Sequence, residues 1–352
     1  MSIRIRCLSV HTTTFTKNFD TAIVALVDIE VIKLRSKLKN SLRRWFDENG
    51  YLEVSTPLLS PSLIPESSIS IFSTIYSSYL HGERELYLVP SPELHMKRII
   101  HKTHQSIYQI SKCFRNDEQS GSHHNPEFTM LEYYTVGADE IDSIEITQRL
   151  FDQTKLPNTP DHLLPPFKKM SMAEVCYLVG GFDLEKVQNI RDLKEVAKNK
   201  GLTLPEKPES WDDTFNRLFL NFVEPFLPQD KPLVIYDYPR QIECLAKDKP
   251  NSFYKKRWEL YAGGVELANC YDEEDDYTKI ADFFRKQATL IALKEGLPIA
   301  DVDYEMLDIF DGTFPQCSGV ALGFDRLLML QGRFTRVGDL ILFNLSDTLK
   351  RI

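Results

Sequence analysis

The arrangement of the predicted strands constrains the fold more than any other feature of this sequence. The run "CFRNDEQSGSHHNPEFTMLEYY" at 113–134 has two alternating polar and apolar stretches around a loop, and "RWELYAGGVELANCY" has two such stretches around Gly263 and Gly264. A Gly-Gly pair between alternating stretches is typical of a two-residue β-hairpin. Because the strands occur as hairpins and not in strict alternation with helices, we expect an α+β fold, an antiparallel β-sheet flanked by helices.

Apolar residues at helical spacing predict the elements around these hairpins. The first helix begins near Asp28 and ends before Gly50, which stands where a helix C-cap belongs. Ser91 is expected to cap a second helix whose first position is Pro92. Further elements are expected as helices at 139–152 and 277–295, a strand at 232–239, a strand, turn and helix at 317–330, a Pro-rich linker at 153–168 and a mostly helical segment at 169–230.

Composition excludes few functions. A chain of 352 residues with 42% hydrophobic residues is long enough for one large domain or two smaller ones. The net charge of −9 neither supports nor excludes nucleic-acid binding, because a local basic patch does not show in that sum. The six cysteines lack zinc-type spacing and are expected to be reduced thiols of a cytosolic protein.

The N-terminal segment carries no sign of a membrane span. Its longest apolar run, "AIVALV", ends at Asp28 and is far shorter than the about 20 residues that a spanning helix needs. Residues 1–19 contain basic and hydroxyl side chains and no acidic residue, which faintly resembles a transit peptide. We expect residues 1–28 to form a flexible extension instead.

The strand at 127–134 has an unusual inner face. Phe128, Met130, Glu132 and Tyr134 share one face, and Arg115 lies beside the same loop on the partner strand. A buried carboxylate without a partner costs several kcal/mol, so Glu132 needs a cation or water. An aromatic ring, a guanidinium and a carboxylate on one surface suit a ligand with a flat ring, an anion and an amine, whereas a plain exposed sheet face is the alternative.

Three segments resemble the motifs of class II aminoacyl-tRNA synthetases, in particular the lysyl enzyme. "FRNDE…HHNPEFTMLEYY" resembles motif 2, "YLEVSTPLL" with Pro57 resembles motif 1, and "GVALGFDRLLML" with Arg326 resembles motif 3. The resemblance implies a catalytic domain at 29–352 that forms a homodimer through the motif 1 element.

The resemblance also implies how ATP is bound. Arg115 would hold the α-phosphate, Phe128 would stack on adenine and Arg326 would lie near the γ-phosphate, with the two arginines as the catalytic pair. The implied ATP-binding residues are Arg115, Asn116, Asp117, His124, Asn125, Phe128, Glu266, Leu267 and Arg326. A fixed arginine stabilises the charge that builds on phosphorus, and removing one such donor costs on the order of 10²-fold or more.

Two carboxylates match positions that bind Mg²⁺ in the family. They are Glu266 and Glu273, and two such oxygen ligands suffice for Mg²⁺ where phosphates complete the shell. Because seven residues separate them, a regular strand would place them on opposite faces, so we expect a bulge or turn after Asn269. Without the family, an acidic hairpin end is usually just solvated.

The implied amino-acid site is rich in acids, which suits a cationic, lysine-type substrate. Its residues would be Ser91, Pro92, Glu93, Glu132, Tyr134, Glu273, Ala321 and Gly323. Motif 3 of the lysyl enzymes has a central glycine where this chain has Ala321. A methyl group in a pocket changes selectivity roughly 10- to 200-fold, which would disfavour an α-amino group and leave room for a β-amino group. Alanine by chance drift is the alternative.

Lysyl-tRNA synthetases also carry an N-terminal OB-fold domain that reads the anticodon. Only about 30 residues precede the first predicted helix, too few for a five-stranded barrel, so no anticodon recognition is expected. The chain is similar instead to the short paralogues that attach (R)-β-lysine to a lysine of elongation factor P through an aminoacyl-adenylate, with ATP and Mg²⁺. The alternatives are a ligase that activates α-lysine for another acceptor and a regulatory relative without activity.

The loop of motif 2 departs from the family pattern. Asp117 stands where glutamate is typical, and the loop lacks the arginine that usually contacts the β- and γ-phosphates. His123 and His124 stand in its place, and neutral imidazoles are weaker phosphate partners than a guanidinium. The loop predicts an altered affinity for ATP.

Overall fold

The structure, a computed structural model, describes residues 28–116, 121–205, 209–294 and 299–343. The predicted extension, apart from Asp28, and the predicted ATP-binding residue Asp117 lie outside the described residues.

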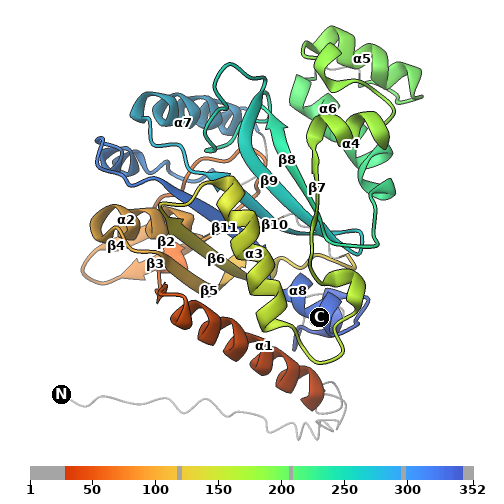
Figure 1. Ribbon diagram of the computed structural model, residues 1–352. Coiled ribbons are helices and arrows are strands. Elements are labelled where there is room, and N and C mark those ends of the chain that lie inside the picture. The colour runs from red at the N-terminus through yellow and green to blue at the C-terminus, as the bar shows by residue number, and fades with distance from the viewer. Residues whose placement is uncertain (1–27, 117–120, 206–208, 295–298, 344–352) are drawn as a thin grey trace, which may run out of the picture.

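An eight-stranded mixed sheet forms the centre of the molecule (Figure 1). Its six inner strands pair antiparallel with one another, and a short strand at each edge pairs in parallel with the inner strand beside it. In spatial order the strands are β1 (Leu52–Glu53), β5 (Ile107–Phe114), β6 (Glu127–Val136), β11 (Cys317–Gly323), β10 (Val265–Asp272), β9 (Tyr254–Ala262), β8 (Leu233–Pro239) and β7 (Lys168–Ser171). The predicted α+β class is confirmed, and the parallel edge pairs are an addition to the predicted antiparallel sheet.

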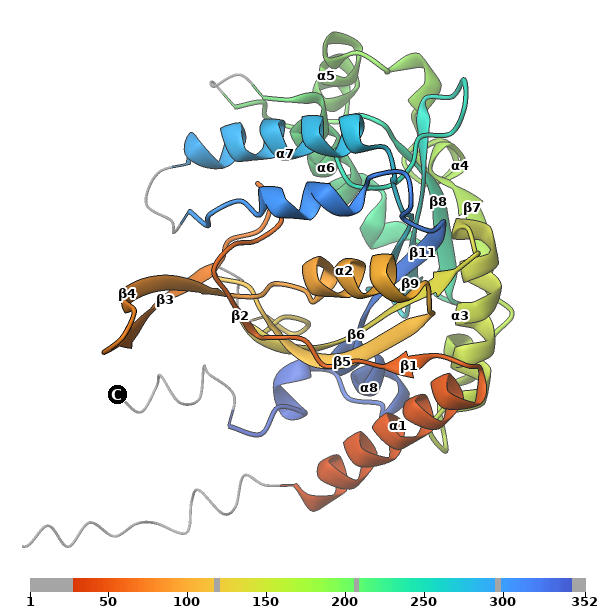
Figure 2. The ribbon, with the colours of Figure 1, turned by 90° about the vertical axis from the view of Figure 1, so that its left-hand side faces the viewer.

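Helices cover both faces of this sheet (Figures 1 and 2). On one face α1 (Ile29–Glu48), α3 (Glu140–Thr154) and α8 (Phe324–Gln331) form the main core with the inward side chains of β6 and β10. On the other face α2 (Glu93–Thr103) and α7 (Tyr277–Ala292) pack in a smaller core. A third core joins α4 (Met172–Leu178), α5 (Ile190–Asn199) and α6 (Trp211–Phe222) to β8.

A second, smaller sheet projects from the body (Figure 2). Its order is β2 (Leu59–Ser60), β4 (Gly82–Leu88) and β3 (Phe72–Ser78), and both pairs are antiparallel. Short 3₁₀ turns at Asp161–Leu163, Leu184–Lys186, Glu224–Phe226, Tyr304–Ile309 and Val337–Asp339 connect the larger elements.

Local chemistry explains most element boundaries. The side chain of Asp28 accepts a hydrogen bond from the backbone N–H of Glu30 and caps α1, and Gly50 follows that helix with a φ of +81°. The hairpin prediction at Gly263 and Gly264 is confirmed, because both residues have positive φ, as a primed two-residue turn requires.

Two local predictions were wrong. Helix α2 starts one residue later than expected, with Pro92 at the N-cap and no side-chain cap, so Ser91 lies outside it. The Pro-rich segment after α3 is also not a free linker, because Leu156, Leu163 and Phe167 are buried in the main core. Prolines end the helix here, but the apolar residues between them still pack.

The described cysteines, Cys113, Cys176, Cys244, Cys270 and Cys317, are all free thiols, as predicted. Among the described helices, none combines the length and the apolar character that crossing a bilayer would require.

Candidate active site

Two adjoining hollows lie on the face of the central sheet that carries Tyr134. The arginine hollow contains Arg115 and Arg326 and has a volume of about 460 Å³, and the acid hollow contains most of the carboxylates and has a volume of about 300 Å³. The residues that line both are Glu66, Ser68, Ile69, Arg115, Met130, Arg257, Asn269 and Ala321. The hollows are therefore two parts of one cleft.

The pleat of β6 supplies the floor of this cleft, as the sequence predicted. Phe128 lines the arginine hollow, and Glu132 and Tyr134 line the acid hollow. Leu131 and Tyr133 point the other way into the main core. One strand therefore holds the core with one face and builds the site with the other.

The arginine hollow holds both predicted catalytic guanidiniums. The guanidinium of Arg115 lies 5.3 Å from the ring centre of Phe128, and its Nε is buried without a hydrogen-bond partner in the described part of the chain. Arg326, in the first turn of α8, donates from Nη1 to the backbone oxygen of Glu266 (3.0 Å) and from Nε to that of His123 (3.1 Å). These bonds hold Arg326 at the wall of the hollow that Arg115 shares.

The motif 2 loop contributes less to this hollow than predicted. His123, His124 and Asn125 line it, and burial, together with the nearby Arg326, lowers the pKa of His123. Asn116 is not among its lining residues, because its side chain donates to the backbone oxygen of Ile71 at 3.2 Å.

Motif 3 and β10 form the opposite wall. Leu267 borders the arginine hollow, but its side chain is buried in the main core. Gly323, expected at the amino-acid site, lies in the arginine hollow at the N-cap of α8.

A β-bulge in β10 lies between the acidic residues that line the two hollows. The register shifts between Glu266 and Ala268, so a bulge exists as predicted but precedes Asn269. Glu266 and Glu259 both line the arginine hollow. Burial first, and then Glu259, raises the pKa of Glu266 to about 7, although Arg326 opposes the rise. The carboxylate neighbour of Glu266 is therefore Glu259, and Glu273 lies in the acid hollow.

A buried lysine organises the acid hollow. The Nζ of Lys97 lies 2.5 Å from Glu93 Oε1 and 2.7 Å from Glu273 Oε2, and only 1% of the lysine side chain is exposed. Burial alone would lower the pKa of Lys97, but Glu273 and Glu93 outweigh it and raise the pKa. Sequence reasoning missed Lys97, although it stands four residues after Glu93 on the buried face of a helix that continues with Ile100.

The acid hollow has an excess of negative groups. Six carboxylates and two guanidiniums line it: Glu66, Glu93, Glu132, Asp212, Glu243 and Glu273 against Arg115 and Arg257. Tyr134 donates to one oxygen of Glu132 at 2.9 Å, and the other oxygen has no partner within the described residues. Burial and the nearby Glu93 raise the pKa of Glu132. The hollow suits a ligand that brings positive charge.

Strand β11 runs through the centre of the site. A Cβ atom at Gly319 would lie 2.2 Å from Glu273 Oε1 and 2.5 Å from the ring of Tyr134, so only glycine fits there. Ala321 stands opposite Glu132 on one side and Asn269 on the other, and it lines both hollows. Ser91 and Glu93 line the acid hollow, whereas Pro92 is buried at the N-cap of α2 and is not among its lining residues.

Comparison with known proteins agrees with this geometry. Residues 22–346 match the family model described as tRNA synthetases class II (D, K and N). This chain belongs to that class II synthetase family. The match confirms the family predicted from the three motifs.

Several family members that are similar to this chain share one name. The chain is 34% identical to a protein named elongation factor P–(R)-β-lysine ligase from Vibrio atlanticus, over 90% of this chain and 95% of the relative. Proteins of the same name are 34% identical in Proteus mirabilis (88% and 93%) and in Histophilus somni strain 2336 (90% and 96%).

In this class II synthetase, Arg257 is a further residue of the site that sequence reasoning missed. It lines both hollows and donates from Nη2 to Glu259 Oε1 at 2.6 Å. Its guanidinium lies over the rings of Tyr238 (4.4 Å) and Tyr271 (5.5 Å). Arg257 directly follows Lys255 and Lys256, and a third basic residue in such a run is usually a surface cation, so no local signal marked it.

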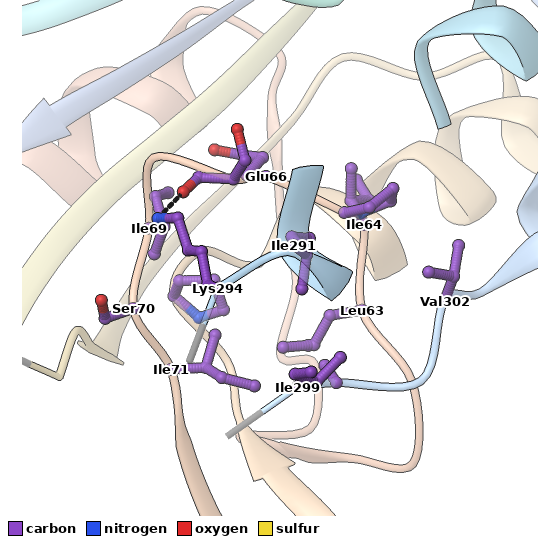
Figure 3. Close-up of a pocket in the computed structure, with 14 residues that line it drawn as sticks. Leu63, Ile64, Glu66, Ile69, Ser70, Ile71, Ile291, Lys294, Ile299 and Val302 are labelled. Atoms are coloured by element: carbon purple, nitrogen blue, oxygen red, sulfur yellow. Dashed lines mark hydrogen bonds between the residues drawn. The ribbon is translucent and has the colours of Figure 1, made fainter. Parts of the chain in front are cut away.

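The turn at 66–70 forms another wall of this class II site (Figure 3). Glu66 and Ile69 line both hollows, and the backbone N–H of Ile69 donates to the oxygen of Glu66 at 3.2 Å. A small apolar pocket lies behind the turn. Gln287 of α7, which lines the acid hollow, accepts from the N–H of Ser67 at 2.8 Å, so this helix supports the turn.

Proposed function

We propose that this chain activates (R)-β-lysine with ATP as an aminoacyl-adenylate and transfers it to a lysine side chain of elongation factor P. The observation that carries the proposal is the joint cleft, in which a hollow with three arginines meets an acidic hollow at Ala321. Membership of the class II family and the names of the similar relatives support the same reaction.

ATP fits the arginine hollow. Arg115 would hold the α-phosphate, Phe128 would stack on adenine, and Arg326 would bind near the γ-phosphate. The hollow is large enough for a nucleotide. Of the other predicted contacts, His124, Asn125, Glu266 and Leu267 line this hollow, whereas Asn116 does not.

Mg²⁺ fits beside Glu266, and we propose Glu259 as the second ligand in place of Glu273. Glu259 and Glu266 line the same hollow, and the nearby Glu259 raises the pKa of Glu266. Glu273 lines the other hollow, where it pairs with Lys97. A hard cation prefers such oxygen donors, and when bound it would neutralise charge on the phosphates.

The diamino acid fits the acid hollow. The unpartnered oxygen of Glu132 and the carboxylates of Glu93 and Glu273 offer acceptors for two ammonium groups. The substrate carboxylate would then face the arginine hollow across Ala321.

The reaction needs no covalent enzyme intermediate. An oxygen of the β-lysine carboxylate attacks the α-phosphorus, an O–P bond forms, and the bond to the leaving pyrophosphate breaks. The neutral ε-amine of the acceptor lysine then attacks the acyl carbon, AMP leaves, and the nitrogen loses a proton. The side chains contribute positioning and charge neutralisation, chiefly through Arg115 and Arg326.

We also propose that the chain acts as a homodimer. Exposed leucines in the motif 1 segment, Leu52, Leu58 and Leu59, support an interface there.

The decisive experiment measures the mass of the acceptor. Purified protein, ATP and Mg²⁺ are incubated with elongation factor P and either (R)-β-lysine or α-lysine, and the factor is weighed by intact mass spectrometry. A gain of one lysyl unit with the β isomer supports the proposal. A gain only with α-lysine indicates the alternative ligase, and no gain together with no ATP–pyrophosphate exchange indicates a regulatory relative.

A further inference from the structure

The ribbon of β3 and β4 presents apolar side chains to solvent at its tip. Tyr79 is fully exposed and Leu80 is 81% exposed. The turn that carries them is ordered, because the hydroxyl oxygen of Ser78 accepts from the N–H groups of Leu80 and His81, at 3.3 Å each. These bonds fix the backbone of the turn, and the two exposed apolar side chains stand where a solvent-facing turn is normally polar.

We propose that this ribbon is a docking arm for the protein acceptor. The inference rests on the proposed function, and it assigns to that function a surface outside the cleft. The ribbon consists of the two strands Phe72–Ser78 and Gly82–Leu88 and the turn between them.

The first argument is that both ends of the ribbon continue into the walls of the cleft. Ser68 and Ile69 line both hollows, and β3 begins three residues after Ile69. Strand β4 ends at Leu88, and Ser91 and Glu93 then line the acid hollow. A molecule that covers the mouth of the cleft therefore lies close to the base of the arm.

The second argument concerns the size of the occupant. Strands of seven residues are about 23 Å long, so the tip lies far beyond any contact that ATP or a diamino acid inside the hollows makes. A protein acceptor differs from these small ligands, because one of its lysines must enter the cleft while the rest of the acceptor's surface stays outside. An arm of this length reaches that surface.

The third argument is that the ribbon lacks a partner of its own. Over Phe72–Ser78, β3 pairs only with β4, so its outer edge is open within the described structure. Ile75 and Tyr76 on this strand are also more than half exposed. An open edge with apolar side chains is a surface that a second protein can cover or extend.

The test compares two matched double variants. Tyr79→Ser/Leu80→Ser removes the apolar tip, and Tyr177→Ser/Leu178→Ser removes another exposed Tyr-Leu pair, on α4. Transfer of β-lysine to elongation factor P is followed by intact mass at varied acceptor concentration. ATP–pyrophosphate exchange with (R)-β-lysine reports the first step alone.

We expect the tip variant to lower kcat/KM for the acceptor about 10-fold, mainly through KM, with pyrophosphate exchange unchanged, since tyrosines are enriched among the few interface residues that carry most of the binding energy. The control should keep wild-type values. If the tip variant leaves KM for the acceptor unchanged, or if the control variant changes KM equally, the proposed docking arm is refuted. A tip variant that alters the molar mass in light scattering also overturns it, because the ribbon would then join two copies.

The two proposals fail differently. If wild-type protein performs pyrophosphate exchange and transfer but the tip variant does so equally well, only the arm is refuted. If the wild-type protein transfers nothing to elongation factor P, the proposed function fails and the arm fails with it.

Discussion

A single methyl group stands where the two hollows meet. Ala321 lines both, so its side chain faces the point at which the substrate carboxylate and amine would separate. We expect Ala321→Gly to enlarge this point and to shift the preference from (R)-β-lysine toward α-lysine by roughly 10-fold or more. The ratio of kcat/KM values in pyrophosphate exchange measures it. A ratio equal to that of the wild type would mean that alanine here is drift.

The buried Lys97 gives a prediction about stability. Replacing it with methionine leaves Glu93 and Glu273 buried without their cation, and breaking such a pair costs about 3–5 kcal/mol. We expect Lys97→Met to lower the free energy of unfolding in urea at pH 8 by that amount. Lys102→Met, on the exposed side of the same helix, should change it by less than about 0.5 kcal/mol. Equal effects of both changes would contradict a role for the buried pairing.

The carboxyl group of Glu66 makes stability depend on pH. Burial and then Glu93 raise its pKa to about 7 in the folded protein, from an ordinary value of 4.5. Between these values the folded state holds the proton more tightly than the unfolded state, so the contribution of Glu66 to stability is complete below pH 4.5 and declines as pH rises to 7. The unfolding free energy of the wild type minus that of Glu66→Gln should therefore fall across this range. The exposed Glu195→Gln serves as the control and should give a flat difference.

At the scale of elements, the bulge in β10 assigns separate roles to two carboxylates. Glu259 and Glu266 face the arginine hollow, and Glu273 faces Lys97. We expect Glu259→Gln to raise the Mg²⁺ concentration needed for half-maximal pyrophosphate exchange, with a smaller effect on KM for β-lysine. Glu273→Gln should show the reverse pattern. If Glu273→Gln alone changes the Mg²⁺ requirement, the pairing inferred from the sequence was right and ours is wrong.

Sequence reasoning found the parts of the site that one element contains. The alternation of β6 correctly separated Phe128, Glu132 and Tyr134 from the core, because a strand's period fixes the faces without knowledge of its neighbours. It could not find Arg257, Glu259 or Lys97 as site residues. Their roles depend on which strands and helices lie next to each other, and that is decided by tertiary packing.

At the scale of the whole molecule, the long hairpins predicted the central sheet but not its edges. Strands β1 and β7 have two and four residues, too few to show an alternating pattern, and each pairs in parallel with a strand distant in sequence. The segment at 169–230 was predicted to be mostly helical. That Asp212 of this segment lines the acid hollow could not be predicted, because α6 meets the cleft only through the packing of the third core.

The motif 1 segment leads to a prediction about assembly. Leu52 and Leu58 are exposed beside the edge strand β1, and burying such side chains contributes about 1.5–3 kcal/mol each. We expect light scattering to give twice the chain mass of 40.8 kDa, and Leu52→Glu/Leu58→Glu to shift the protein toward the monomer. Leu178→Glu, on an equally exposed site of α4, should leave the mass unchanged. A wild-type protein that is monomeric at micromolar concentration would refute the homodimer and show that each cleft works within one chain.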